Sequence, residues 1–198
     1  MSLAILGSAL AATAFPQADM KSFEVGNPKF AYRNVATVES EGEFESFTGK
    51  TNSVTGNINI NMAKKNGSGV LEVDVASIDT GIPLRNEHMR SAGWLDADKF
   101  PTIKFATKGV KGFGNDFYSV PGTLTLHGIS KPVTAKVRIR YRAASAQTKA
   151  AGFDGDVIQI STKFNIKLSD YGVNIPAMAK GKVAETVTIG FSGYAVSK

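Results

Sequence analysis

Cysteine is absent from this chain of 198 residues. Its absence excludes disulfide bonds, thiol nucleophiles, iron–sulfur clusters, thiolate zinc sites and a lipid-modified N-terminal cysteine. Histidine is scarce as well, because only His88 and His127 occur. They form neither a His-x-His nor a His-Glu-x-x-His spacing, so the sequence predicts no metal site and no metal cofactor.

Catalytic motifs are also missing. No serine lies in a nucleophile elbow, and there is no glycine-rich loop of the kind that holds phosphate groups. The carboxylates of Asp74, Asp79, Asp96 and Asp170 are scattered along the chain without a visible partner arrangement. The sequence therefore favours a protein that is not an enzyme, although a catalytic dyad assembled across strands would leave no local signature.

Long hydrophobic runs are absent beyond the first residues. Residues 4–14 form an apolar, alanine-rich stretch that is too short to cross a bilayer, which takes about 20 residues. Residues 15–19 then resemble the cleavage region of a secretory signal peptide. We interpret residues 1–18 as a signal-peptide-like segment, of which residues 1–3 can come from an expression vector, and a poorly ordered tail is the alternative. Residues 19–198 then form one domain of a periplasmic or secreted protein.

Positive charge exceeds negative charge, with a net charge of +6 and a pI of about 9.5. The strongest basic feature is a row at every second position, made of Lys136, Arg138, Arg140 and Arg142. Such a row is typical of the solvated outer face of a strand, and transient contact with an anionic membrane surface is the alternative. Aromatic residues do not interleave with the row, so it does not predict nucleic-acid binding.

Alternation of apolar and polar residues dominates from Phe23 onward and is typical of strands with one apolar face. The clearest run is 131–142, whose apolar positions are Val133, Ala135, Val137, Ile139 and Tyr141. Similar runs give about eight or nine strands, one of which is expected to contain Phe30 and Tyr32. Because short turns join most of these runs, neighbouring strands are expected to pair antiparallel.

The fold class is therefore all-β, and periodicity alone leaves two architectures open, a two-sheet sandwich and a barrel. The strands are about ten residues long, which corresponds to roughly 33 Å. An eight-stranded barrel of that height can hold one small ligand, or its interior can be filled by side chains.

One segment departs from the strand pattern and predicts a short helix at about 82–93. Asp79 or Thr80 is expected to cap it, Pro83 suits its first turn, and Gly93 falls near its end. The irregular segment 169–179 is expected to cross an end of the barrel. Residues 143–155, rich in alanine and small polar residues, predict a long hairpin loop.

Three sequence signatures occur in a fixed order. They are Ser77-Ile78-Asp79-Thr80-Gly81-Ile82-Pro83-Leu84-Arg85-Asn86 and its continuation to 105, Gly122-Thr123-Leu124-Thr125-Leu126-His127-Gly128 and its continuation to 133, and Phe164-Asn165-Ile166-Lys167-Leu168-Ser169-Asp170-Tyr171-Gly172-Val173. In composition, order and spacing they resemble the YceI-like family, over roughly residues 23–196. The chain departs from that family's pattern at Asn86, where aspartate is commoner, at Trp94 and Leu95, where phenylalanines are commoner, and in 26–33, which lacks histidine.

The resemblance implies an extended, eight-stranded, antiparallel, lipocalin-like β-barrel of the bacterial cell envelope, with the short helix at its mouth. It implies a long-chain apolar lipid in the lumen, a polyisoprenoid or similar amphiphile, which the protein carries or stores without another cofactor. Two alternatives stay open: an enzyme acting on an isoprenoid-like substrate in the same cavity, and a structural or stress-response barrel with a packed interior. Association into a homodimer also stays open.

The inward faces of the predicted strands supply candidate ligand-binding side chains, with two more from the helix region. The set is Phe30, Tyr32, Val73, Val75, Met89, Trp94, Phe105, Leu124, Leu126, Ile139, Phe164, Ile166, Ile189 and Phe191. Their alternative role is a close-packed core. Arg85, His88 and Arg90 are candidates for contact with a polar head group, and ion pairs that tie the helix to the strands are the alternative for the arginines.

Overall fold

The computed structural model describes residues 20–197 except 62, 65 and 115. The signal-peptide-like segment predicted at 1–18 lies outside these residues. Eleven strands form one sheet. They are β1 (Lys21–Val25), β2 (Val35–Glu41), β3 (Ser46–Thr51), β4 (Val54–Asn61), β5 (Asn66–Asp74), β6 (Thr102–Thr107), β7 (Lys111–Gly114), β8 (Phe117–Leu126), β9 (Ile129–Arg142), β10 (Val157–Lys167) and β11 (Thr186–Ser197).

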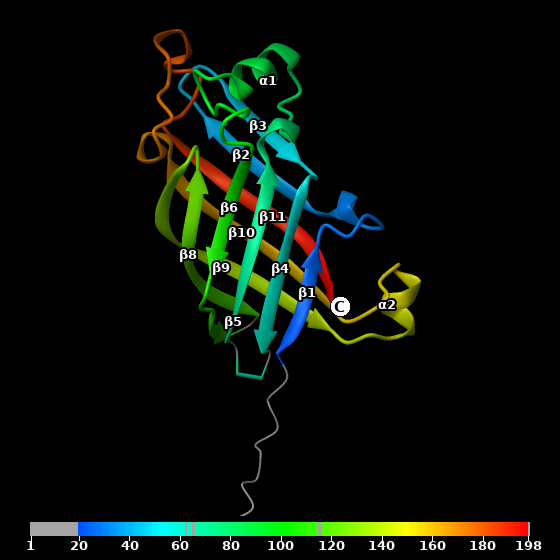
Figure 1. Cartoon of the computed structure of the whole chain (residues 1–198). Helices are drawn as coiled ribbons and strands as arrows, with labels where there is room; N and C mark the ends of the chain where they lie inside the picture. Colours follow the sequence, from blue (N-terminus) through cyan, green and yellow to red (C-terminus); the bar gives the residue numbers. More distant parts are fainter. Residues whose placement is uncertain (1–19, 62, 65, 115, 198) are drawn as a thin grey trace, which may run out of the picture.

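Eight of these strands close into a barrel, in the order β1, β4, β5, β6, β8, β9, β10, β11 and back to β1 (Figure 1). All of these pairings are antiparallel. Phe23 of β1 stands at the closure, opposite Ile58 of β4 on one side and Ser197 of β11 on the other. The prediction of an eight-stranded antiparallel barrel is confirmed, and the alternative of a two-sheet sandwich is excluded.

The edge of β11 that pairs with β1 also pairs with a second strand, β2. Residues 195–197 of β11 pair with β1, whereas residues 188–192 pair with β2. β2 continues the sheet to β3, and a single bridge joins Lys50 of β3 to Asp79, just before the helix. The wall of the barrel is therefore completed by β1 near one end and by the β2–β3 hairpin near the other end (Figure 1).

The predicted strand through Phe30 and Tyr32 is wrong. After β1 the chain turns at Gly26, whose φ is +92°, and residues Ala31–Arg33 form the 3-10 helix η1. The buried Asn34 then fixes the entry to β2, because its side-chain oxygen accepts a hydrogen bond from the Tyr194 N–H at 2.7 Å. The alternation of apolar residues continues through this turn, so the pattern alone extended the strand too far.

The helix α1 (Pro83–Arg90) begins at the predicted proline and ends three residues earlier than expected. Its N-cap residue is Ile82, so the prediction of an Asp79 or Thr80 cap is wrong. The segment predicted as a loop at 143–155 contains the helix α2 (Ala146–Ala150), where Ser145 and Thr148 form a reciprocal capping box. None of the helices in the described part of the chain is long and apolar enough to cross a membrane.

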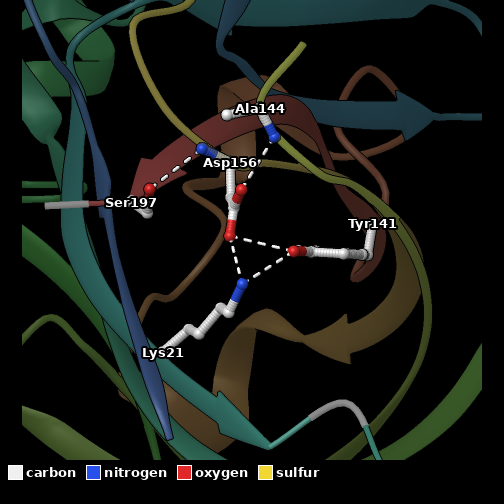
Figure 2. A network of polar contacts seen from close by, with 5 residues as sticks. All are labelled: Lys21, Tyr141, Ala144, Asp156 and Ser197. Carbon is white, nitrogen blue, oxygen red and sulfur yellow. Dashed lines mark hydrogen bonds and ion pairs between the residues drawn. The ribbon is translucent and has the colours of Figure 1, made fainter. Parts of the chain in front are cut away.

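The end of the barrel far from α1 is packed with side chains and fastened by a polar network (Figure 2). The Lys21 ammonium donates hydrogen bonds to the Asp156 carboxylate and, at 2.8 Å, to the Tyr141 hydroxyl. The same carboxylate accepts hydrogen bonds from Tyr141 and from the Ala144 N–H, at 2.9 and 2.8 Å. The Asp156 N–H donates to the Ser197 hydroxyl at 2.9 Å, so the network joins β1, β9 and β11.

Candidate functional site

A cavity of about 490 Å³ opens at the end of the barrel that carries α1; we call it the mouth cavity. Its wall combines α1, the β2–β3 hairpin, strand ends and the connection between β10 and β11, which contains η3 (Leu168–Tyr171) and η4 (Ala177–Ala179). The apolar lining residues are Val38, Phe47, Ile78, Ile82, Leu84, Met89, Trp94, Leu95, Ile103, Leu126, Ile166, Leu168, Val173, Met178, Ala179, Val183, Val187 and Ile189. The segment 169–179 therefore does cross an end of the barrel, as predicted.

A second cavity of about 130 Å³, the deep chamber, lies further along the barrel interior. Ile103 and Ile189 line both cavities, so the two spaces meet at these residues. The other large apolar side chains around the deep chamber are Val54, Ile58, Ile60, Val70, Leu71, Val73, Phe105, Val110, Val120, Leu124, Val137, Ile139, Ile160, Phe164 and Phe191. Apolar side chains thus line the barrel interior from the mouth cavity to the deep chamber.

The loop that leads into α1 is held by the side chains of Asp79 and Asn86. The Asp79 carboxylate accepts hydrogen bonds from the Gly81 N–H at 2.9 Å and from the Asn86 amide at 2.6 Å. The side-chain oxygen of Asn86 accepts hydrogen bonds from the Thr80 N–H and hydroxyl, at 2.8 and 2.7 Å. The Gly81 N–H, followed by the Asn86 amide, holds the pKa of the Asp79 carboxyl below its ordinary value.

This arrangement gives a reason for asparagine at position 86. An amide group donates through nitrogen and accepts through oxygen, so the Asn86 side chain can donate to Asp79 and accept from Thr80 at the same time. An ionised aspartate accepts hydrogen bonds only, and it would place a second carboxylate against Asp79. The departure from the commoner aspartate is therefore matched to the loop that positions α1.

Arg85 fastens α1 to the neighbouring hairpin. Its guanidinium donates to the Glu45 carboxylate and lies 4.3 Å from the centroid of the Phe47 ring. All three residues line the mouth cavity. The positive charge of Arg85 is therefore engaged by an ion pair and an aromatic face, which is the structural role left open for it by the sequence.

Two other basic side chains line the mouth cavity, and both are exposed: His88 on α1 and Lys182 on the connection between β10 and β11. Lys182 follows Gly181, whose φ of +75° turns the chain there, and its N–H donates to the Ala179 carbonyl at 3.1 Å. Within the described residues Lys182 takes part in no ion pair. Among the described residues its ammonium group is therefore both exposed and without an ionic partner.

The family of this chain is established by comparison with known proteins. The model of the YceI-like domain matches residues 19–195. The chain belongs to the YceI-like family. A UPF0312 protein of Azotobacter vinelandii is 34% identical to this family member over 120 residues, which are 60% of the chain and 59% of that relative. A UPF0312 protein of Shewanella denitrificans is 28% identical over 159 residues, covering 78% of the chain and 80% of that protein.

Solved structures show the same YceI-like fold. BcnA of Burkholderia cenocepacia superimposes with a TM-score of 0.70 at 23% identity, covering 85% of this chain and 98% of BcnA. A polyisoprenoid binding domain from Saccharophagus degradans, implicated in plant cell wall breakdown, gives a TM-score of 0.66 at 16% identity. That match covers 91% of this chain and the whole of the other. At these identities the likeness concerns the fold.

Most of the candidate ligand-binding residues of this YceI-like chain lie beside one of the two cavities. Those at the mouth cavity are Met89, Trp94, Leu126, Ile166 and Ile189, with Arg85 and His88 among the head-group candidates. Those at the deep chamber are Val73, Phe105, Leu124, Ile139, Phe164 and Phe191, and Ile189 again. Their contact with a ligand stays a prediction.

Four of the candidates lie elsewhere. Phe30 packs in a separate cluster with Phe153, at a ring-centroid distance of 5.2 Å, because the chain has left the barrel at Gly26. Tyr32 on η1 is 65% exposed. Val75 is buried outside both cavities, since β5 ends at Asp74 and a 3-10 helix, η2 (Val75–Ser77), begins.

Arg90 is the fourth, and it does not line the mouth cavity. Its guanidinium turns back and donates to the Ile78 carbonyl at 3.3 Å. Val38, Phe47, Leu84 and Met178 also line the mouth cavity, although the sequence did not predict them as site residues. The apolar alternation of β2 points to Val38. Phe47 is the one large apolar side chain of β3, Leu84 lies on α1 and Met178 on η4, so strand periodicity gives no signal for these three. Among the described residues, no group of histidine and acidic side chains is arranged to hold a metal ion.

Proposed function

We propose that this YceI-like protein binds one long apolar chain, a polyisoprenoid or similar amphiphile, along the interior of its barrel. The observation that carries the proposal is the meeting of the mouth cavity and the deep chamber at Ile103 and Ile189. Two adjoining apolar spaces, one at the mouth and one deeper in the barrel, suit a long hydrocarbon chain better than a compact ligand. The name of the Saccharophagus degradans domain, which shares the fold, supports the same ligand class.

Binding of such a ligand needs little polar recognition in the interior. Transfer of a hydrocarbon chain from water gains about 0.8 kcal/mol for each buried methylene group. Side chains such as Phe105, Leu124 and Phe164 around the deep chamber supply the apolar contacts. The depth to which the chain enters then sets both affinity and the preferred chain length.

The polar end of the ligand lies at the mouth in this proposal. Lys182 and His88 line the opening, and Lys182 forms no ion pair within the described residues. Arg85 is already paired with Glu45, so we assign it to holding α1. An acidic head group would gain a charge-assisted hydrogen bond from Lys182.

We further propose that the protein carries or stores this lipid without altering it, and that it does so in the periplasm or outside the cell. The signal-peptide-like character of residues 1–18 supports the location. The mouth cavity supports the binding role, because its one acidic lining residue, Glu45, is engaged by Arg85.

Native mass spectrometry tests the proposal on protein purified from its own organism. We expect a mass increment that organic extraction releases as an unaltered prenyl compound, and we expect the stripped protein to rebind prenyl alcohols of defined length. Absence of any extractable apolar compound, together with no binding of added prenyl alcohols, would favour the packed-barrel alternative. Conversion of an added prenyl compound into a product would favour the enzyme.

A further inference from the structure

Four large apolar side chains are exposed around the mouth of the barrel. Phe44 is 76% exposed, Met178 80%, Leu84 60% and Ile82 47%. They come from the β2–β3 hairpin, η4 and the α1 region, which gather at one end of the molecule (Figure 1). Exposed apolar side chains that occur singly are ordinary, but a group around one opening is typical of an interaction surface. We call these four residues the rim.

The rim is continuous with the interior. Ile82, Leu84 and Met178 also line the mouth cavity, so each has one part toward the lumen and another toward solvent. Phe44 does not line the cavity, but it is fixed beside the same opening: its N–H donates to the Gly181 carbonyl at 2.8 Å. Its ring packs so closely on Gly181 that a Cβ atom there would lie 2.6 Å away.

Charged side chains accompany the rim. Lys180 and Lys182 are exposed on the loop that carries Met178. Glu43 and Glu87 are exposed on the β2–β3 hairpin and on α1. The charges at this end are therefore of both signs, and the rim is suited to bind mainly through apolar contact and not through net charge.

We propose that the rim docks on the surface of a lipid bilayer, with Phe44, Leu84 and Met178 entering the interfacial region. This inference rests on the proposed function, because a chain that passes from a bilayer into the barrel avoids water only if the mouth meets the membrane. The continuity of rim and lumen favours a bilayer over a protein partner. Lys180 and Lys182 beside the apolar residues suit the phosphate groups of the head-group layer.

Vesicle flotation tests the docking directly. The wild-type protein is expected to float with phosphatidylcholine vesicles, and more strongly when a third of the lipid is phosphatidylglycerol. Leu84→Asp combined with Met178→Asp is expected to lower the floated fraction roughly tenfold. Tyr32→Asp is the matched control, since Tyr32 is 65% exposed on η1, away from the rim, and should float like the wild type. Failure of the wild type to float with either vesicle, or an equal loss in Tyr32→Asp, would overturn the inference.

A second measurement separates this inference from the proposed function. Phe44→Asp alters the rim without touching the cavity, so it should reduce flotation while prenyl alcohol delivered from detergent micelles is bound as by the wild type. If the wild-type protein binds prenyl alcohol but does not float, only the docking inference is overturned. If the wild-type protein does not bind prenyl alcohol, the proposed function is overturned. Size-exclusion chromatography completes the test: a wild-type dimer that Phe44→Asp converts to a monomer would assign the rim to a second copy instead.

Discussion

Lys21 and Asp156 are 135 positions apart in the sequence, and they form an ion pair where the first strand of the barrel meets the last. Lys21, followed by the Ala144 N–H, holds the pKa of the Asp156 carboxyl below its ordinary value, and Asp156 in turn raises the pKa of the Lys21 ammonium. A carboxyl whose pKa is lowered by folding stabilises the protein at pH values above its unfolded pKa. The pair thus contributes to closure of the barrel at neutral pH.

Asp156→Asn should lower the free energy of unfolding by about 1–2 kcal/mol at pH 7, because hydrogen bonds to a charged group are lost while Lys21 stays partly solvated. As pH falls below about 4, the unfolded state takes up a proton before the native carboxyl does, so the wild type loses this contribution and the two proteins converge. Urea unfolding at pH 7 and pH 3 measures both effects. A difference between the proteins that is equal at the two pH values would contradict the assignment.

Asn86→Asp should weaken the loop before α1. The new carboxylate faces Asp79 and loses the amide donor, so we expect a fall in Tm of about 2–4 °C at pH 7 that diminishes when the pair shares a proton in acid. Hydrogen exchange should quicken in the amides of 79–86. Asn174→Asp adds the same charge at an exposed position between η3 and η4 and should leave both measurements unchanged.

Ile139→Trp should shorten the longest prenyl chain that the protein accepts. Ile139 is buried on β9 beside the deep chamber, and a larger side chain there fills space that the end of the chain would occupy. Overfilling also costs about 1–3 kcal/mol of stability, so thermal unfolding must be followed in parallel. Arg140→Trp, on the opposite face of the same strand, is the control. Equal binding of all chain lengths by Ile139→Trp would show that the chain stops short of the deep chamber.

Lys182→Gln should discriminate between ligands by their head groups. We expect its Kd for a prenyl phosphate to rise roughly threefold to tenfold and its Kd for the corresponding alcohol to stay the same, because only the phosphate gains a charge-assisted hydrogen bond. Lys180→Gln removes the same charge from an exposed neighbour that does not line the cavity, and it serves as the reference. An equal loss for alcohol and phosphate would indicate a packing role for Lys182.

The barrel could be predicted because its strands follow a simple rule. On β9 the alternation that was read from the sequence matches burial, since Ala135, Val137 and Ile139 are all buried. The helix was predicted from Pro83 and from the break in alternation, and its start is correct. Both features depend on residues close together in the sequence. Such local patterns predict the structure correctly when the apolar face of the element is the face that becomes buried.

Other features depend on contacts between distant segments. Tyr32 keeps the strand pattern, yet Asn34 and Tyr194 end that pattern with a hydrogen bond between segments far apart in the sequence. The short helix α2 relies on a capping box instead of an apolar stripe, so periodicity could not reveal it. Lys182 reaches the mouth only because the connection between β10 and β11 folds over the barrel end, and no motif around it marks that position.

The divided edge of β11 has a consequence for ligands of different length. Because β1 closes only the packed end and β2 lines the opposite part of the same strand, the entrance does not depend on the first strand. A variant in which β1 separates from its neighbours would keep the opening at the mouth and lose closure of the barrel at the packed end. Such a protein would no longer limit the length of the bound chain, because the tail of an overlong prenyl chain could project through the open end.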